Sequence, residues 1–192
     1  MKRVRPYGVL EMRAYHEAGH VLVALAEGFR VKRVTIARHG RLGGACEYGF
    51  SVPRNASRRA LRGIVCATAA VALAGSAAQD REALARGLVA LDPRSGAPLP
   101  LFAAGSEDDE RIATRFARRL HPSAAARRAY LGRVRTRVER VLDDPGAWAA
   151  VRRLARALLR TRTLTGDEAA RTARRAIADV LRAGTAVRRR AA

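Results

Sequence analysis

Residues 14–20 read Ala14-Tyr15-His16-Glu17-Ala18-Gly19-His20, and this stretch decides the fold and the chemistry expected of the chain. Two histidines four residues apart lie on one face of a helix, one turn apart, so both imidazoles can reach a single metal ion. Glu17 projects nearby and can take a proton from water at that metal. This is the HExxH pattern, in which two histidines bind zinc and the glutamate is the general base for peptide hydrolysis.

The residues around the motif favour a helix over 10–28. No proline interrupts this segment, and Gly28 stands where a helix commonly ends. Gly19, inside the helix, removes bulk beside the metal or lets another segment approach closely. The alternative is a helix whose histidines lie on a polar face and bind nothing. The apolar residues that support the helix are Leu10, Tyr15, Val21, Leu22, Val23, Leu25 and Ala26.

The length and composition predict one domain with a substantial core, because 48% of the 192 residues are hydrophobic. Cys46 and Cys66 form no disulfide or CxxC pattern, which favours a reduced, cytoplasmic chain. The basic N-terminus precedes no long apolar stretch, so we expect no signal peptide. The most apolar run, 64–78, is shorter than the roughly 20 residues of a membrane span. It predicts a buried core helix and no transmembrane segment.

The net charge of +21 indicates a surface that attracts nucleic acid or anionic lipid nonspecifically. Only Lys2 and Lys32 are lysines, and the arginines are spread through nearly the whole chain. No aromatic-interleaved RNA-binding pattern appears among them. Specific nucleic-acid binding therefore stays an alternative function, which salt-sensitive retention on DNA would favour.

The pattern beyond the first helix predicts a small β-hairpin followed by helices. Residues 31–38 alternate and are rich in β-branched side chains, 39–44 form a turn, and 45–52 return as a second strand. An extended substrate peptide can pair with an exposed strand edge beside the HExxH helix. The other interpretation is an ordinary hairpin packed on that helix, and both can hold together.

The rest of the chain predicts helices, which makes the fold α+β and mostly α-helical. We expect one domain at 10–183 with its C-terminal helices at about 124–183, between a basic segment 1–9 and a disordered basic tail 184–192. Ser57 lies near the start of one helix, and Ser106 with Asp109 resembles a capping box. Proline and glycine make 92–100 a loop, 143–146 a turn, and 163–168 a cap. The expected helices span 54–78, 79–90, 106–120, 124–142, 148–162 and a final segment ending near 182.

A catalytic zinc needs three protein ligands and an open position for water, and the motif supplies two of them. The third can be His39, His121 or a carboxylate. The acidic cluster 107–110 is the densest group of acids in an otherwise basic chain. Helix capping alone would also explain acids there, so the residues by themselves leave the third ligand open.

Several segments, in order, resemble the peptidase domain of the FtsH-type ATP-dependent zinc metalloproteases over about residues 10–175. Residues 14–20 resemble that family's AYHEAGHA signature, and 34–36 with 40–44 resemble the strand and loop leading to its substrate-binding edge. Residues 74–80 resemble its GGRAAEE segment, 108–114 its NDLxxAT segment, and 154–168 its C-terminal ALLEKETLDGEE region. The resemblance implies zinc held by His16, His20 and Asp109, with Asp108 the neighbouring alternative.

The same resemblance implies a substrate-binding edge, and it also has departures. The edge residues would be Thr35, Ile36, Gly43 and Gly44. A Gln79-Asp80 pair replaces two glutamates of the family, which puts a supporting hydrogen bond in doubt. The stretch between the third ligand and the C-terminal helices looks shorter than in the family, so its surface and oligomer contacts differ. The chain has no GxxxxGK[ST] phosphate loop.

Together these features predict a zinc-dependent, cytoplasmic metalloendopeptidase that hydrolyses unfolded or flexible polypeptides without an ATPase of its own. Its expected partners are the polypeptide substrate and a separate ATPase, unfoldase or adaptor, and its oligomeric state stays open. The alternatives are a catalytically weak metallopeptidase-like binding module and a basic nucleic-acid-binding protein. The intact Glu17 argues against a binding module, which has no need of a base.

Overall fold

The HExxH residues lie on helix α1 (Val9–Ala26), at the centre of a computed structural model that describes residues 8–37, 43–52, 54–91, 98–100 and 106–191. The helix ends where the sequence predicts, because Gly28 adopts a positive φ of 78°. Backbone N–H groups of Gly28 and Phe29 donate to the carbonyls of Leu25 and Ala24, a Schellman arrangement that satisfies the last turn. The chain then turns directly into the first strand.

A three-stranded antiparallel sheet has the order β2-β1-β5, with β1 (Arg30–Thr35) between β2 (Ala45–Gly49) and β5 (Thr163–Thr165). The two predicted hairpin strands are present but shorter than expected. The third strand was missed, because the sequence indicates only a helix cap there. It is both, since the Thr165 backbone N–H donates to the Glu168 carboxylate while the Glu168 N–H donates to Thr165 Oγ1.

Helix α2 (Arg58–Ala85) is one continuous helix where the sequence predicts two, and it packs along α1. It starts at the expected cap, where Ser57 Oγ accepts from the Ala60 N–H at 3.2 Å. Among the helices of the described residues, α2 is long and apolar enough to cross a membrane. However, 61% of its most apolar 18-residue stretch is buried inside the fold. Core helices of soluble proteins share these properties, so α2 gives only weak support for a span.

Close packing of α1 on α2 depends on Gly19. A Cβ on Gly19 would lie 2.4 Å from the Ala74 carbonyl oxygen and 2.7 Å from the Ala78 Cβ. Of the two roles that the sequence allows for this glycine, the close approach of another segment is the one observed. The alanine-rich middle of α2 is correspondingly buried against α1.

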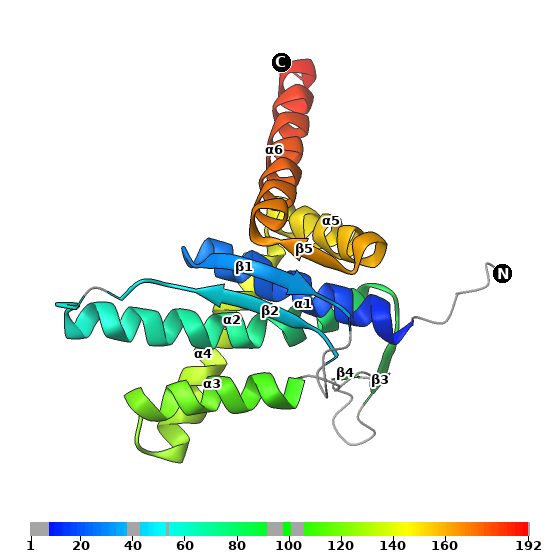
Figure 1. The fold of residues 1–192 in the computed structure, drawn as a ribbon. Coiled ribbons are helices and arrows are strands. Elements are labelled where there is room, and N and C mark those ends of the chain that lie inside the picture. The colour runs from blue at the N-terminus through cyan, green and yellow to red at the C-terminus, as the bar shows by residue number, and fades with distance from the viewer. Residues whose placement is uncertain (1–7, 38–42, 53, 92–97, 101–105, 192) are drawn as a thin grey trace.

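The remaining helices flank the α1–α2 pair. Helix α3 (Ser106–Leu120) lies on one side with α4 (Ala124–Asp143), and α5 (Pro145–Thr161), β5 and α6 (Gly166–Ala191) lie on the other (Figure 1). The far end of α6 projects away from the other elements. The coarse prediction, a mostly helical α+β fold with a small sheet, is confirmed.

Three further boundaries differ from the sequence-based expectation. Residues 86–90 are not helical, because Gly87 takes a positive φ of 67° and the chain enters β3 (Val89–Leu91), which pairs with β4 (Pro98–Pro100). Helix α5 begins three residues early, with Pro145 in its first turn and the Asp144 carboxylate accepting from the Ala147 N–H. Helix α6 continues to Ala191, through most of the segment expected to be a disordered tail.

Candidate metal centre

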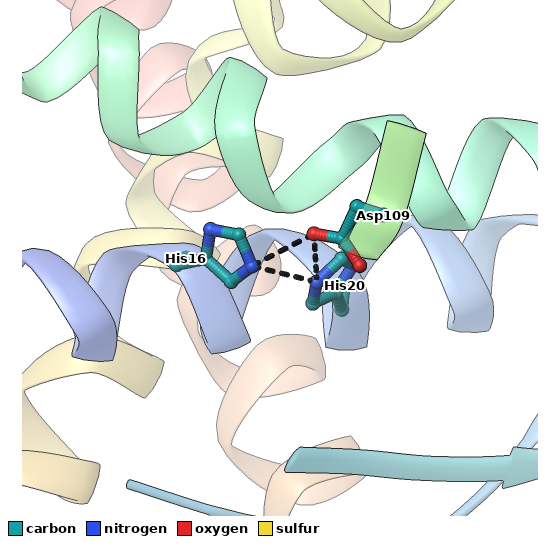
Figure 2. A group of neighbouring side chains, drawn as sticks. All are labelled: His16, His20 and Asp109. Carbon is teal, nitrogen blue, oxygen red and sulfur yellow. Dashed lines mark hydrogen bonds and ion pairs between the residues drawn. The ribbon is translucent and has the colours of Figure 1, made fainter. Parts of the chain in front are cut away.

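The buried face of α1 carries all three functional residues of the motif. His16, Glu17 and His20 are only 6%, 5% and 7% exposed. The first turn of α3 brings Asp109 to the same point, so the carboxylate reaches the two imidazoles from a helix distant in the sequence (Figure 2). The cluster exists because α1 and α3 both pack against α2.

Three ligand-type atoms form a tight triangle. The Nε2 atoms of His16 and His20 are 3.0 Å apart, and Asp109 Oδ2 lies 2.9 Å from the first and 3.2 Å from the second. Among the described residues, these three form the group of side chains that could hold a metal ion. Tetrahedral zinc with bonds of about 2.0–2.1 Å needs ligand atoms about 3.3 Å apart, close to these separations.

One atom of the triangle, Asp109 Oδ2, is left without an ordinary hydrogen bond. Asp109 Oδ2 is buried and makes no hydrogen bond of good geometry with any described residue, although both imidazoles are within ion-pair distance. A buried carboxylate oxygen without such a bond is costly, and a cation coordinated there would satisfy it. Two imidazoles and one carboxylate are also a common donor set for catalytic zinc. The residues present therefore fit a zinc ion.

Gly75 on α2 keeps the space beside the imidazoles open. A Cβ at this position would lie 2.5 Å from His20 Nε2 and 2.6 Å from His16 Nε2, too close for either ring to stay in place. This role of Gly75 is not among the predictions made from the sequence. The sequence signal that could have indicated this role is a glycine in the middle of an alanine-rich helix, within the segment that resembles the family's GGRAAEE stretch.

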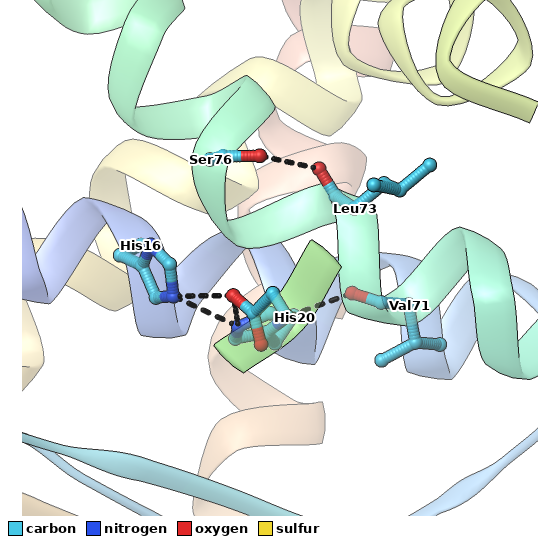
Figure 3. Close-up of polar contacts among 6 residues, drawn as sticks. His16, His20, Val71, Leu73 and Ser76 are labelled. Carbon is cyan, nitrogen blue, oxygen red and sulfur yellow. Dashed lines mark hydrogen bonds and ion pairs between the residues drawn. The ribbon is translucent and has the colours of Figure 1, made fainter. Parts of the chain in front are cut away.

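The two imidazoles are oriented differently. His20 Nδ1 lies 2.7 Å from the Val71 carbonyl oxygen on α2 and donates to it, which leaves Nε2 free to bind a metal (Figure 3). His16 Nδ1 is buried and has no hydrogen-bond partner among the described residues. The Ser76 hydroxyl does not help, because it donates to Leu73 O within α2. The departure from the family at Gln79-Asp80 puts a supporting hydrogen bond in doubt, and neither of these residues bonds to His16 Nδ1.

The charges within the triangle shift two pKa values in opposite directions. Burial disfavours the ionised form of each group, but the ion pair outweighs it. Asp109 raises the pKa of His20 to about 9, and the contacts with His16 and His20 lower the pKa of Asp109 to about 2. In metal-free protein the pair therefore stabilises the fold. That stabilisation is lost as pH rises through about 9, or falls through about 2.

Glu17 lies where a general base is needed. Burial raises the pKa of Glu17, and the positive charges of His20 and His16 partly oppose this rise. Its carboxylate packs against the start of β2, because a Cβ on Gly44 would lie 2.6 Å from Glu17 Oε1. A carboxylate with a raised pKa beside a metal site suits both removal and delivery of a proton near neutral pH.

Of the alternatives for the third ligand, the geometry favours Asp109. Asp108 is exposed and pairs with Arg111 on the same helix. His121 follows the end of α3, where its ring packs on Tyr130 at a centroid distance of 4.8 Å. His39 lies outside the described residues.

The predicted substrate-binding residues separate into two groups. Gly43 and Gly44 lie against Arg13 and Glu17, beside the candidate metal centre. Thr35 and Ile36 do not offer a free edge, because β1 is the central strand: Thr35 Oγ1 lies 2.8 Å from Thr163 Oγ1, and the Ile36 N–H donates to the Arg162 carbonyl. The edge strand next to Glu17 is β2. A substrate strand therefore cannot pair with Thr35 and Ile36 as expected, because β1 already has a neighbour on each side.

Comparisons with known proteins add no assignment. No family model matches the chain, and no curated protein matches it. Any functional conclusion therefore depends on the motif, the resemblance and the geometry of the candidate centre.

Proposed function

We propose that the chain is a zinc-dependent metalloendopeptidase, with His16, His20 and Asp109 as ligands and Glu17 as general base. The observation that carries the proposal is the convergence of three ligand-type atoms to 2.9–3.2 Å from two helices, with Glu17 beside them. Zinc held there would supply Lewis-acid chemistry, activating water and polarising the scissile carbonyl.

The residues of the chain have separate tasks in this proposal. Glu17 takes a proton from the attacking water and delivers it to the leaving amine. The Val71 carbonyl holds His20 in the tautomer that presents Nε2. The β2 edge, which starts beside Glu17, pairs with an extended substrate backbone and places a peptide bond at the centre.

The substrate class follows from this mode of binding. Only an unfolded or flexible polypeptide can add a strand to β2, so we propose such chains as substrates. The resemblance to FtsH-type peptidase domains supports this reading, and the 192 residues contain no phosphate-loop motif. A separate ATPase, unfoldase or adaptor would then deliver folded substrates. A cytoplasmic location is proposed from the two cysteines without a disulfide pattern.

The test combines metal analysis with cleavage of casein by purified protein. Wild type should hold one zinc per chain and cleave casein, and Glu17→Gln should keep the zinc but lose activity by about 100-fold or more. Asp109→Ala should lose both. Asp108→Ala is the matched control, because it removes the neighbouring exposed acid and should change neither zinc content nor activity.

Three results would contradict the proposal in different ways. Full zinc affinity in Asp109→Ala would remove that residue from the ligand set. Bound zinc with no cleavage of any unfolded substrate would favour a metallopeptidase-like binding module. If the wild type binds no zinc but binds DNA tightly and in a salt-sensitive way, the nucleic-acid alternative would be favoured.

A further inference from the structure

Arg13 is a charged residue beside the candidate centre that the proposed mechanism does not use. It lies on α1 four residues before Glu17, so both side chains project from one face of the helix. Its Nη1 donates to the Ile36 carbonyl at 3.2 Å, at the end of β1. The rest of the guanidinium packs on Gly43, where an added Cβ would lie 2.7 Å from both Nε and Nη2.

Two successive glycines thus make room for two successive turns of α1. Gly43 accommodates the Arg13 guanidinium and Gly44 accommodates the Glu17 carboxylate, immediately before β2 begins. The two α1 side chains therefore lie together at the start of the edge strand. A substrate strand on β2 would pass both of them.

The Arg13 guanidinium has no carboxylate partner. No Asp or Glu oxygen among the described residues lies within 4.0 Å of it, and its Nη1 donates to the Ile36 carbonyl. Arg13 is partly buried and its charge opposes the rise that burial causes in the pKa of Glu17, but no carboxylate of the described residues lies within ion-pair distance of its donors. Its fork-shaped donors match a carboxylate, which they can bind through two hydrogen bonds.

We propose that Arg13 binds a carboxylate of the substrate and so selects where the chain is cut. This inference rests on the proposed peptidase function. Glu17 is four positions after Arg13 on the helix, a rise of about 6 Å, which equals about two residues of extended peptide. The carboxylate is therefore one or two residues from the scissile bond. It is either the C-terminal carboxylate or an Asp or Glu side chain.

The test uses matched peptides that separate the two sources. One pair differs only in a free or amidated C-terminus, and another only in Glu or Gln one or two residues from the cleaved bond. Wild type should prefer the charged member of one pair by about tenfold or more in kcat/KM. Arg13→Gln should abolish that preference, and Arg13→Lys should keep part of it. Arg30→Gln, which removes one exposed charge from β1, should leave it unchanged.

A binding measurement makes the inference independent of turnover. In the Glu17→Gln background, fluorescence anisotropy should show tighter binding of the charged peptide by about tenfold, and adding Arg13→Gln should remove the difference. Equal binding and equal cleavage of both members by wild type would overturn the inference while leaving the peptidase proposal intact. Selective binding that depends on Arg13, with no cleavage by zinc-loaded wild type, would overturn the peptidase proposal but support the carboxylate site.

Discussion

Gly75→Ala is the most direct test of whether the space between the imidazoles is a metal site. The added Cβ would lie 2.5 Å from His20 Nε2 and 2.6 Å from His16 Nε2. Ordinary contacts between such atoms are about 3.4 Å or more, so each ring must move by about 0.8–0.9 Å. Zinc sites tolerate changes of only about 0.2 Å in ligand distance, and the substitution should therefore displace at least one ligand.

The expected loss of zinc affinity is at least about 100-fold, which corresponds to about 2.7 kcal/mol. The fold itself should suffer little, because alanine in a helix interior is favoured over glycine by about 1 kcal/mol, which offsets part of the strain. Chelator competition measures the affinity, and thermal unfolding with and without zinc measures the stabilisation by metal.

Gly63→Ala provides the matched control on the same helix. A Cβ there meets nothing within 4 Å, so this variant should become more stable by up to about 1 kcal/mol and bind zinc as wild type does. Wild-type zinc affinity in Gly75→Ala would refute the reasoning. It would show that the ion does not occupy the space beside the two Nε2 atoms, which the new Cβ fills.

Three further predictions concern protons, packing and capping. Since the pKa of His20 is raised to about 9, zinc must displace its proton at neutral pH. Calorimetry in buffers of different ionisation enthalpy should show about one proton released at pH 7, with affinity rising about tenfold per pH unit up to about 9; a pH-independent affinity would contradict this. Gly19→Ala places a Cβ 2.4 Å from the Ala74 carbonyl and should destabilise the protein by about 1–3 kcal/mol in urea unfolding. An unchanged midpoint would show that α1 and α2 can separate without cost. Asp144→Ala removes the cap of α5 and should cost about 1 kcal/mol by the same measurement, whereas Asp144→Asn should retain most of the stability.

Local sequence signals were sufficient for much of the fold. The helix carrying the motif ends at Gly28 because a positive φ is available to glycine at little cost, and this position could be read directly from the sequence. Ser57 likewise marks the start of α2. The missed elements are those whose hydrogen bonds come from distant segments, above all β5, which pairs with β1 more than a hundred residues earlier.

By itself the sequence determined the two histidines and the base, because their relative positions depend only on the period of one helix. The tertiary structure decided which acid completes the triangle. Asp108 and Asp109 are neighbours on α3, but only Asp109 points toward the imidazoles of α1, whereas Asp108 pairs with Arg111. It also decided that Gly75 is the residue that leaves room beside the rings, and that β2 rather than β1 has the free edge. These features depend on how separate elements pack together, and local periodicity in the chain carries no direct record of that packing.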